Sequence, residues 1–546
     1  METILTESTD HHGGVLRRVR SVGVLTLISR VAGLIRDSIM AAQFGNGAIS
    51  DAFALAFRVP NMARQLFGEG ALSTAFLPVF LRDREQGGLE AAHRTGTAVL
   101  LVIALALLCV VILTEAVLAA ISLTLALPYE ALLLLNLLML LTPYLLLVCV
   151  VAQASAIMHG LGQFTLPALY PIALNALWIV SAWCLGQTSL TAENRIYGVS
   201  WSIVAIGILQ VLLCVPALHS VGFRFELDWT TSRSRVVEIT RTMLPVVLGL
   251  SITQLNTASD SIFAWIFTAP VDGEAGWLNH YPLTAGTTHA LYLGQRMLQF
   301  PIGVFGAALG TVIYPVLTLH AERRQFDLFR ADLTRGLRLV VAIGVPASMG
   351  LVLIAEPLTE LLFQRGKFDV RDSQQTASII AMYALGVWAA CGLMISQRAF
   401  YACGDRATPL RIGLAIAVLN IVLNVALIYP LGARGLALAT SLATATQCVL
   451  TVIELHRKTS SVDWRLLSAT GMRTAIATTV MCCVFFATES LLQSIMPEHS
   501  SRIRLLKTAI EVSASVIVYA GIGWLIGLKE PLELCRPTKV HTLRKE

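Results

Sequence analysis

Apolar segments about 20 residues long recur along the whole chain, and each is long enough to cross the hydrocarbon core of a membrane as a helix. The 546-residue sequence is 55% hydrophobic and only 14% charged, a composition far from that of a soluble globular protein. Continuously apolar segments such as 98–113 exclude a β-barrel, whose strands alternate polar and apolar residues. Because a helix satisfies its own backbone hydrogen bonds in lipid, the sequence predicts an all-α polytopic membrane protein.

Turn residues and charges divide the apolar segments into about 14 predicted transmembrane helices, and an even number places both termini on one side. That side collects roughly 26 Lys and Arg residues against roughly 8 on the other, so the positive-inside rule predicts cytoplasmic termini. The predicted spans are 20–44, 48–81, 96–124, 131–158, 165–186, 196–218, 239–268, 283–318, 337–363, 376–402, 409–430, 434–455, 471–494 and 506–528.

An internal repeat links the two halves of the chain at an offset of roughly 220 to 240 residues. Asp37-Ser38-Ile39 in the first half matches Asp260-Ser261-Ile262 in the second half. At an offset within the same range, Arg58 falls within one position of Arg296. The repeat keeps the chain direction, so it predicts two pseudo-symmetric six-helix lobes related by an axis along the membrane normal, plus two extra C-terminal helices. The predicted divisions are a cytoplasmic N-terminal tail 1–19, an N-lobe 20–225, a C-lobe 226–460, the two extra helices in 461–530 and a cytoplasmic C-terminal tail 531–546.

Arginine is the basic residue found deep within the predicted spans. A charge at the centre of a membrane helix costs about 2.5–3.5 kcal/mol, so such residues normally face a water-filled cavity and a partner. The guanidinium pairs two-pronged with phosphate, and the nearby acids are too few to neutralise the set, which predicts a pocket for a phosphate or pyrophosphate. Snorkelling and internal ion pairing are the alternatives. The arginines are Arg30, Arg36, Arg58, Arg64, Arg296 and Arg398, and the nearby acids are Asp37, Asp51 and Glu69.

Proline and glycine occur in two spans that are expected to bend. The second span would be about 48 Å long as one straight helix, too long to cross directly, and it contains Pro60. The eighth span contains Pro301 and Gly303, as a rocking or gating helix needs. Close helix packing by small residues is the alternative.

Polar residues in the second half suggest a separate small-cation site, formed by oxygen ligands. Interhelical hydrogen bonding is the alternative explanation for the same residues. The sequence lacks a P-loop, G-x-S-x-G, H-E-x-x-H or zinc spacing, so we expect neither ATP-driven transport nor an enzyme. The residues of this predicted small-cation site are Asp260, Asn420, Asn424 and Thr440.

Motifs in the first two spans and in the eighth resemble those of the MurJ (MviN) family, and the likeness covers nearly the whole chain. The resemblance implies a member of the multidrug/oligosaccharidyl-lipid/polysaccharide exporter superfamily, with 14 helices in two lobes, that flips lipid II outward by alternating access. The motifs are Ser29 through Asp37, Asp51-Ala52-Phe53, Pro60-Asn61, Arg64 through Ala71, Gln295-Arg296, Phe300-Pro301, Gly303-Val304 and Leu309-Gly310-Thr311.

The resemblance also implies roles for individual residues. The family's cavity arginines correspond to Arg30, Arg36, Arg64 and Arg296 and its cavity aspartate to Asp51, a set expected to hold the pyrophosphate of the substrate. Asp37, Arg58, Pro60, Asn61, Glu69 and Gly303 are expected to support the cavity or its gating. Some members hold sodium in the second lobe; here Asn424 stands where those members have an acid, and Gln295 replaces an acid often found before the arginine.

The function predicted from these features is lipid II translocation across the bacterial cytoplasmic membrane, with lipid II and membrane lipids as partners. We expect no nucleic acid, a monomer in contact with cell-wall synthesis enzymes, no cofactor, and coupling to sodium or to the membrane potential. The prenyl tail is expected to follow a groove made by the last two spans. The alternatives are a flippase for another polyprenyl-linked glycan, an exporter of amphipathic drugs, and a non-transporting scaffold for envelope assembly.

Overall fold

The computed structural model describes residues 2–270, 280–495, 501–528 and 530, and this part is almost entirely helical. Within it, ten helices are long and apolar enough to cross a membrane, or twelve when two bent pairs each count as one span. Helix α1 (Glu2–Phe44) and the segment that begins with α2 (Ala48–Ala63) lie where the first two spans were predicted, so the expected count of fourteen is roughly consistent with the structure. The all-α membrane fold is therefore confirmed, while the predicted tail 531–546 lies outside the described residues.

The first lobe is built around α4, which packs against α2, α3 and α6. Its core joins Leu137 and Cys149 of α4 to Ile203 of α6, all fully buried. Thr191 caps the start of α6 by accepting a hydrogen bond from the backbone N–H of Asn194, as is typical at a helix N-terminus. After α1 and α2, the elements of this lobe are η1 (Arg64–Ala71), α3 (Leu72–Thr124), α4 (Tyr129–Gly160), α5 (Thr165–Gly186) and α6 (Ala192–Ser220).

The second lobe centres on α13, which packs against α9, α10 and α15. The last two helices pack on each other, and they reach this lobe through α10 and α11. Its elements are α7 (Trp229–Ile266), α8 (Thr287–Pro301), η2 (Ile302–Gly306), α9 (Ala307–Glu322), α10 (Phe326–Leu353), α11 (Ala355–Phe363), α12 (Val370–Ala384), α13 (Val387–Ala402), α14 (Ala407–Leu431) and α15 (Ala433–Thr459), followed by the extra helices α16 (Trp464–Ile495) and α17 (Ser501–Leu525).

Both spans expected to bend are interrupted by π-helical turns at the expected places. In the second span η1 follows Pro60, and in the eighth η2 follows Pro301. Proline removes a backbone N–H donor from the helical ladder, so the following turn is free to widen. The two halves of the eighth span are bent by 42° relative to each other.

Some predicted span boundaries were wrong. The expected connection 82–95 is helical except at Gly88, where two helices that together form α3 meet at a kink, and the φ of 75° there suits glycine. The predicted seventh span began at 239, yet α7 begins at Trp229, where Asp228 caps it. The predicted tenth span, 376–402, begins earlier, at Val370; α12 and α13 are separated by a short break but form one candidate span together. Charged residues on these helical extensions hid their continuity in the hydropathy pattern.

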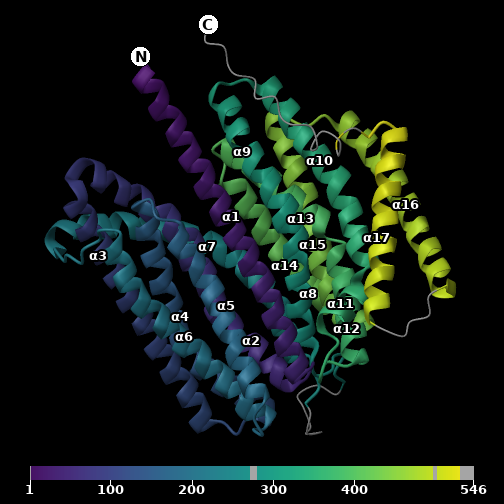
Figure 1. Cartoon of the computed structure of the whole chain (residues 1–546), viewed down its shortest axis with the longest axis horizontal. Helices are drawn as coiled ribbons and strands as arrows, with labels where there is room; N and C mark the ends of the chain where they lie inside the picture. The colour runs from purple at the N-terminus through teal and green to yellow at the C-terminus, as the bar shows by residue number, and fades with distance from the viewer. Residues whose placement is uncertain (1, 271–279, 496–500, 529, 531–546) are drawn as a thin grey trace.

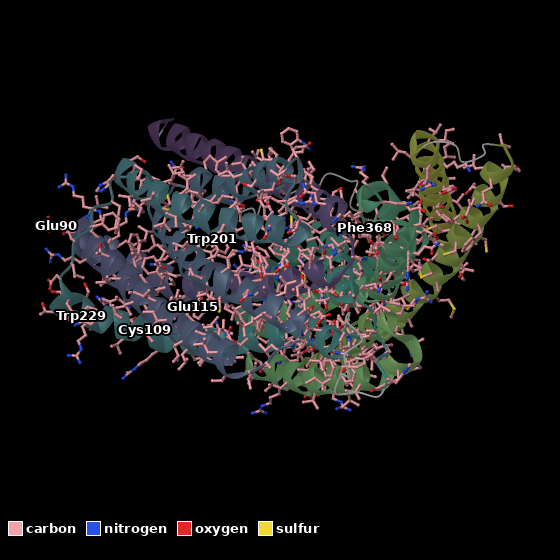
Figure 2. The ribbon with its side chains drawn as sticks, turned by 90° about the horizontal axis from the view of Figure 1, so that it is seen from below. Glu90, Cys109, Glu115, Trp201, Trp229 and Phe368 are labelled. Atoms are coloured by element: carbon pink, nitrogen blue, oxygen red, sulfur yellow. The ribbon has the colours of Figure 1, made fainter. Side chains whose placement is uncertain are left out.

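The two lobes lean apart toward the end at which α1 begins and come together at the other end (Figure 1). Helix α1 runs between them, and α2 of the first lobe packs against α8 of the second. Seen from below, α16 and α17 lie at the edge farthest from the first lobe (Figure 2). Trp201 and Cys109 lie on the outer part of the first lobe and are exposed, as suits side chains that face lipid.

Candidate functional site

Arg36 and Asp37 form a buried ion pair on α1, between the lobes. The Nε and Nη2 atoms of Arg36 donate to Oδ1 of Asp37 at 3.0 and 2.6 Å. Nη1 donates to Oδ1 of Asn175 at 3.1 Å, and the guanidinium lies 4.3 Å from the ring centroid of Trp178. With only 7% of its side chain exposed, Arg36 is held by an acid, an amide and an aromatic face together.

The same carboxylate also binds an arginine of the other lobe. Nε of Arg296 on α8 donates to Oδ2 of Asp37 at 3.1 Å, and Nη1 donates to Gln299 at 3.0 Å. The hydroxyl of Tyr292 accepts from Nη2 of Arg36 at 3.1 Å and donates to Asp37 at 3.3 Å. Two guanidinium groups thus share one carboxylate, which leaves a net positive charge where the lobes meet. The Arg296 side chain is 30% exposed and therefore accessible to a ligand.

Two glycines leave room for arginine side chains that extend between α1 and the eighth span. A Cβ at Gly33 would lie 2.6 Å from Nη2 of Arg296, and a Cβ at Gly303 would overlap the guanidinium of Arg30. Arg30 itself is exposed. The absence of a side chain at each glycine therefore leaves room for a guanidinium group, while the predicted role of Gly303 in supporting the cavity stays a prediction.

Arg64 lies farther along the second span, at the start of η1. Its Nε and Nη2 atoms donate to Oδ1 of Asn61 at 3.3 and 3.1 Å, one helical turn earlier. The neighbouring Gln65 accepts a hydrogen bond of 2.7 Å from Gln254 of α7, which links this turn to the second lobe. Pro60 is buried, and the side chain of Glu69 lies outside the described part of the structure.

Asp51 lies apart from the arginines and caps a helix of the other lobe. Its Oδ2 and Oδ1 atoms accept hydrogen bonds from the backbone N–H groups of Gly286 and His289, at 2.6 and 2.7 Å. A carboxylate at this position satisfies free donors and interacts favourably with the positive end of the α8 dipole. Its predicted role in substrate binding stays a prediction; the geometry gives it a contact between the lobes.

Further contacts close the end of the molecule where Asp51 lies. The Oδ1 atom of Asn46 lies 2.7 Å from Nδ1 of His289, and its backbone N–H donates to Asp372 at 3.0 Å. The backbone N–H of Lys367 donates to the carbonyl of Ala42 at 2.8 Å. These bonds join the α1–α2 turn to α8 and to the start of α12, so the lobes are in contact at this end.

The four residues of the predicted cation site come together in the second lobe. Asp260 of α7 is fully buried and accepts from Asn424 of α14 at 3.0 Å and from Thr440 of α15 at 2.6 Å. Asn420 accepts from Asn424 at 2.8 Å and donates to Thr440 at 3.1 Å. A fifth residue, Tyr383 of α12, donates from its hydroxyl to Oδ2 of Asp260 at 3.0 Å.

This arrangement does not fit a bound sodium ion, because hydrogens and not lone pairs point toward the carboxylate. A hard cation needs several oxygen ligands at once. Here Asp260 already accepts three donors, and the only oxygen of the predicted four residues without a hydrogen bond among the described residues is Oδ1 of Asn424. The described residues also contain no cluster of three or more His, Cys, Asp or Glu side chains suited to a metal.

Uncharged residues of the site were missed in the sequence. Tyr292 precedes Arg296 by one helical turn and therefore shares its face, which is a signal that could have found it. Asn175 and Trp178 are three positions apart on α5 and meet Arg36 together. Asn175 was recognisable as a polar residue within a span, whereas the position of Trp178 follows only from the packing of α5 against α1.

Comparisons with known proteins agree with this architecture. The family model described as "Lipid II flippase MurJ" matches residues 40–506. A "Probable lipid II flippase MurJ" of Vibrio cholerae serotype O1 is 33% identical over 448 residues, covering 80% of this chain and 82% of its own. A solved structure described as "Lipid II flippase MurJ, inward closed conformation" matches with a TM-score of 0.72 at 20% identity, covering 94% of this chain and 99% of its own.

The fold extends to a wider superfamily. An inward-facing multidrug resistance transporter of the MATE family, in the MOP superfamily, matches with a TM-score of 0.61 at 14% identity, covering 80% of this chain and 98% of its own. That likeness concerns the fold alone. The family match over most of the chain, together with a relative above 30% identity, shows that the chain belongs to the MurJ lipid II flippase family.

Proposed function

We propose that this chain translocates lipid II from the inner to the outer leaflet of the bacterial cytoplasmic membrane by alternating access. The observation that carries the proposal is the unbalanced positive charge between the lobes, where Arg36 and Arg296 share the single carboxylate of Asp37. A pyrophosphate has several anionic oxygens, and guanidinium groups bind such oxygens in pairs. Arg30 is exposed and Arg296 is partly exposed, so these two arginines make the first contact with the pyrophosphate.

The closed end sets the direction from which the substrate enters. The Asp51 carboxylate accepts hydrogen bonds from the backbone N–H groups of Gly286 and His289, and Asn46 bonds to His289; these bonds hold the lobes together at the end opposite the start of α1. With both termini cytoplasmic, as the distribution of Lys and Arg favours, the lobes separate toward the cytoplasm. Lipid II then enters from the inner leaflet, with its sugar-pentapeptide head group between the lobes.

The π-helical turns supply the flexible points for rocking of the lobes. Both η1 and η2 lie in helices that contribute arginines to the site, so a change of bend moves the charges together with the helices. The site is net positive, so the membrane potential acts on it as the lobes move. The energy is about 2.3 kcal/mol per charge per 100 mV for a full crossing.

The prenyl tail of lipid II follows the side of the molecule formed by the two extra helices, of which α17 lines a pocket. A pocket between α11 and α17 has apolar walls that include Leu358, Leu361 and Leu505. Arg504 and Glu360, which form an ion pair, also line this pocket. An isoprenoid chain matches such walls, because it buries apolar surface and brings no polar group that needs a partner.

Flipping of fluorescent lipid II in proteoliposomes tests the proposal. The label is attached to the head group, and a membrane-impermeant quencher reports the lipid II on the outer surface. Arg30→Gln is expected to lower the flipping rate at least about tenfold, since it removes a charge-assisted contact. The matched control Arg233→Gln, at an exposed position at the start of α7, should leave it unchanged. Equal rates for Arg30→Gln and wild type would instead favour a non-transporting scaffold.

A further inference from the structure

The two repeats place an acid of each lobe next to an arginine of the other lobe. Asp37 and Asp260 occupy matching positions in the repeat, as do Arg58 and Arg296. Arg296 binds Asp37 directly. Arg58 of α2, in the first lobe, extends to the second lobe. Its Nη1 donates to the hydroxyl of Ser261, the residue that follows Asp260.

A continuous chain of hydrogen bonds connects Arg58 to Asp260. Nη2 of Arg58 donates to Oε1 of Gln295 at 2.6 Å, and Nε2 of Gln295 donates to the hydroxyl of Tyr383 at 3.0 Å. That hydroxyl donates to Oδ2 of Asp260 at 3.0 Å. Each hydrogen bond in this chain donates in the same direction, from the cationic Arg58 toward the carboxylate of Asp260. Hydrogen bonds arranged in this way polarise and strengthen one another.

Glutamine suits position 295 because its amide both accepts and donates. The oxygen takes the bond from Arg58, and the nitrogen supplies the bond to Tyr383. An ionised glutamate at this position would accept hydrogen bonds from both Arg58 and Tyr383. It would also form an ion pair with Arg58 and so balance the positive charge of Arg58 in place of Asp260. With glutamine, that charge remains available to Asp260.

Asp260 needs a positive partner because its side chain is fully buried. A buried carboxylate without a counter-charge is costly even when it is hydrogen-bonded. Arg58 is the cationic side chain at the other end of the hydrogen-bond chain that reaches Asp260. Asn424, in turn, brings a neutral amide to the carboxylate and adds no second negative charge.

We propose that Arg58 takes the place of a bound monovalent cation at Asp260, so that the polar cluster of the second lobe is a charge-balanced contact with the first lobe. Arg58 acts as a positioning residue, because it reaches Asp260 through Gln295 and Tyr383. Movement of α2 away from α7 separates the charges, which makes the contact specific to the arrangement of lobes seen here. The proposal rests on this geometry and is tested without lipid II, so its failure leaves the proposed function standing.

Thermal unfolding of the purified full-length protein in detergent, in NaCl and in choline chloride at equal ionic strength, provides the first test. Wild type is expected to melt at the same temperature in both salts. A sodium-specific rise in the melting temperature of wild type that Asp260→Asn abolishes would overturn the proposal, because it would show a cation bound at the carboxylate.

A double-mutant cycle provides the second test. Arg58→Gln should lower the melting temperature by leaving Asp260 unbalanced, and adding Asp260→Asn should restore part of the loss, since it removes the unpaired charge. Arg58→Lys, which keeps the charge, should fall between Arg58→Gln and wild type, and the control Arg233→Gln should match wild type. Additive losses in the double variant, or equal losses for Arg58→Lys and Arg58→Gln, would reject the charge-balancing role. If Arg58→Gln does not fold, the proposal is still tested by comparing the melting temperatures of wild type in NaCl and in choline chloride.

Discussion

Arg296 on α8 donates from Nε to Oδ2 of Asp37 on α1, at 3.1 Å, across 259 positions of sequence. The pair joins the two lobes at the place where Arg36 also binds the same carboxylate. One acid therefore positions two guanidinium groups. For the anionic substrate proposed above, the partly exposed Arg296 would be held in place in advance, whereas Arg36 is buried and already hydrogen-bonded.

Replacement of Arg296 by glutamine should reduce the rate of lipid II flipping by roughly tenfold to a hundredfold, because one charge-assisted hydrogen bond to the substrate is lost. Arg296→Lys should recover only part of the activity, because an ammonium lacks the planar fork. The rate is measured by quenching of labelled lipid II in proteoliposomes. A lysine variant as active as wild type would show that charge alone matters and that paired hydrogen bonds to phosphate do not.

Replacement of Asp37 by asparagine should destabilise the fold more than any exposed ion-pair variant. Arg36 has 7% of its side chain exposed, so loss of the carboxylate leaves a buried charge unbalanced, at a cost of about 3–5 kcal/mol. The free energy of unfolding in detergent measures the effect. Glu454→Gln, which breaks an exposed pair with Arg457, should cost about 1 kcal/mol or less. Comparable losses in the two variants would contradict the dependence on burial.

The membrane class and the two bent spans were predictable because they leave local signals. The length of an apolar segment indicates whether it can span the membrane. Pro60 and Pro301 indicate the bends near which η1 and η2 occur. Asp260, Asn420, Asn424 and Thr440 do lie together, as predicted from their polarity within apolar segments.

The partners of the charged residues were not predictable, because they depend on how the lobes meet. No local pattern indicates that Asp51 caps α8 or that Arg58 reaches Gln295. Tyr383 completes the cluster around Asp260 from a helix 123 positions away. Such contacts are tertiary, and a single sequence carries no periodicity that reports them.

Replacement of Gly303 by alanine should impair flipping and leave stability almost unchanged. The added Cβ would overlap the guanidinium of Arg30, which lies at the end of a flexible side chain and can turn away. We therefore expect a change in unfolding free energy within about 0.5 kcal/mol but a lower flipping rate, because Arg30 leaves its position. Gly350→Ala is the matched control, since a Cβ there meets no atom within 4 Å. If both variants flip lipid II equally well, the position of Arg30 has no part in transport.

Replacement of Asp51 by alanine should loosen the closed end of the molecule. The variant loses two hydrogen bonds to the start of α8 and the favourable interaction with its dipole, which is worth up to about 2 kcal/mol. A difference of 1.4 kcal/mol changes the ratio of two states by about tenfold, so a second population should become detectable. Spin labels at Tyr129 and Val370, which are both exposed and lie in different lobes, report the separation. Asp51→Asn, which keeps one acceptor oxygen, should show a smaller population at the longer distance. A distance distribution identical to wild type in Asp51→Ala would mean that Asn46 and the contacts of Ala42 with Lys367 hold this end closed without the carboxylate.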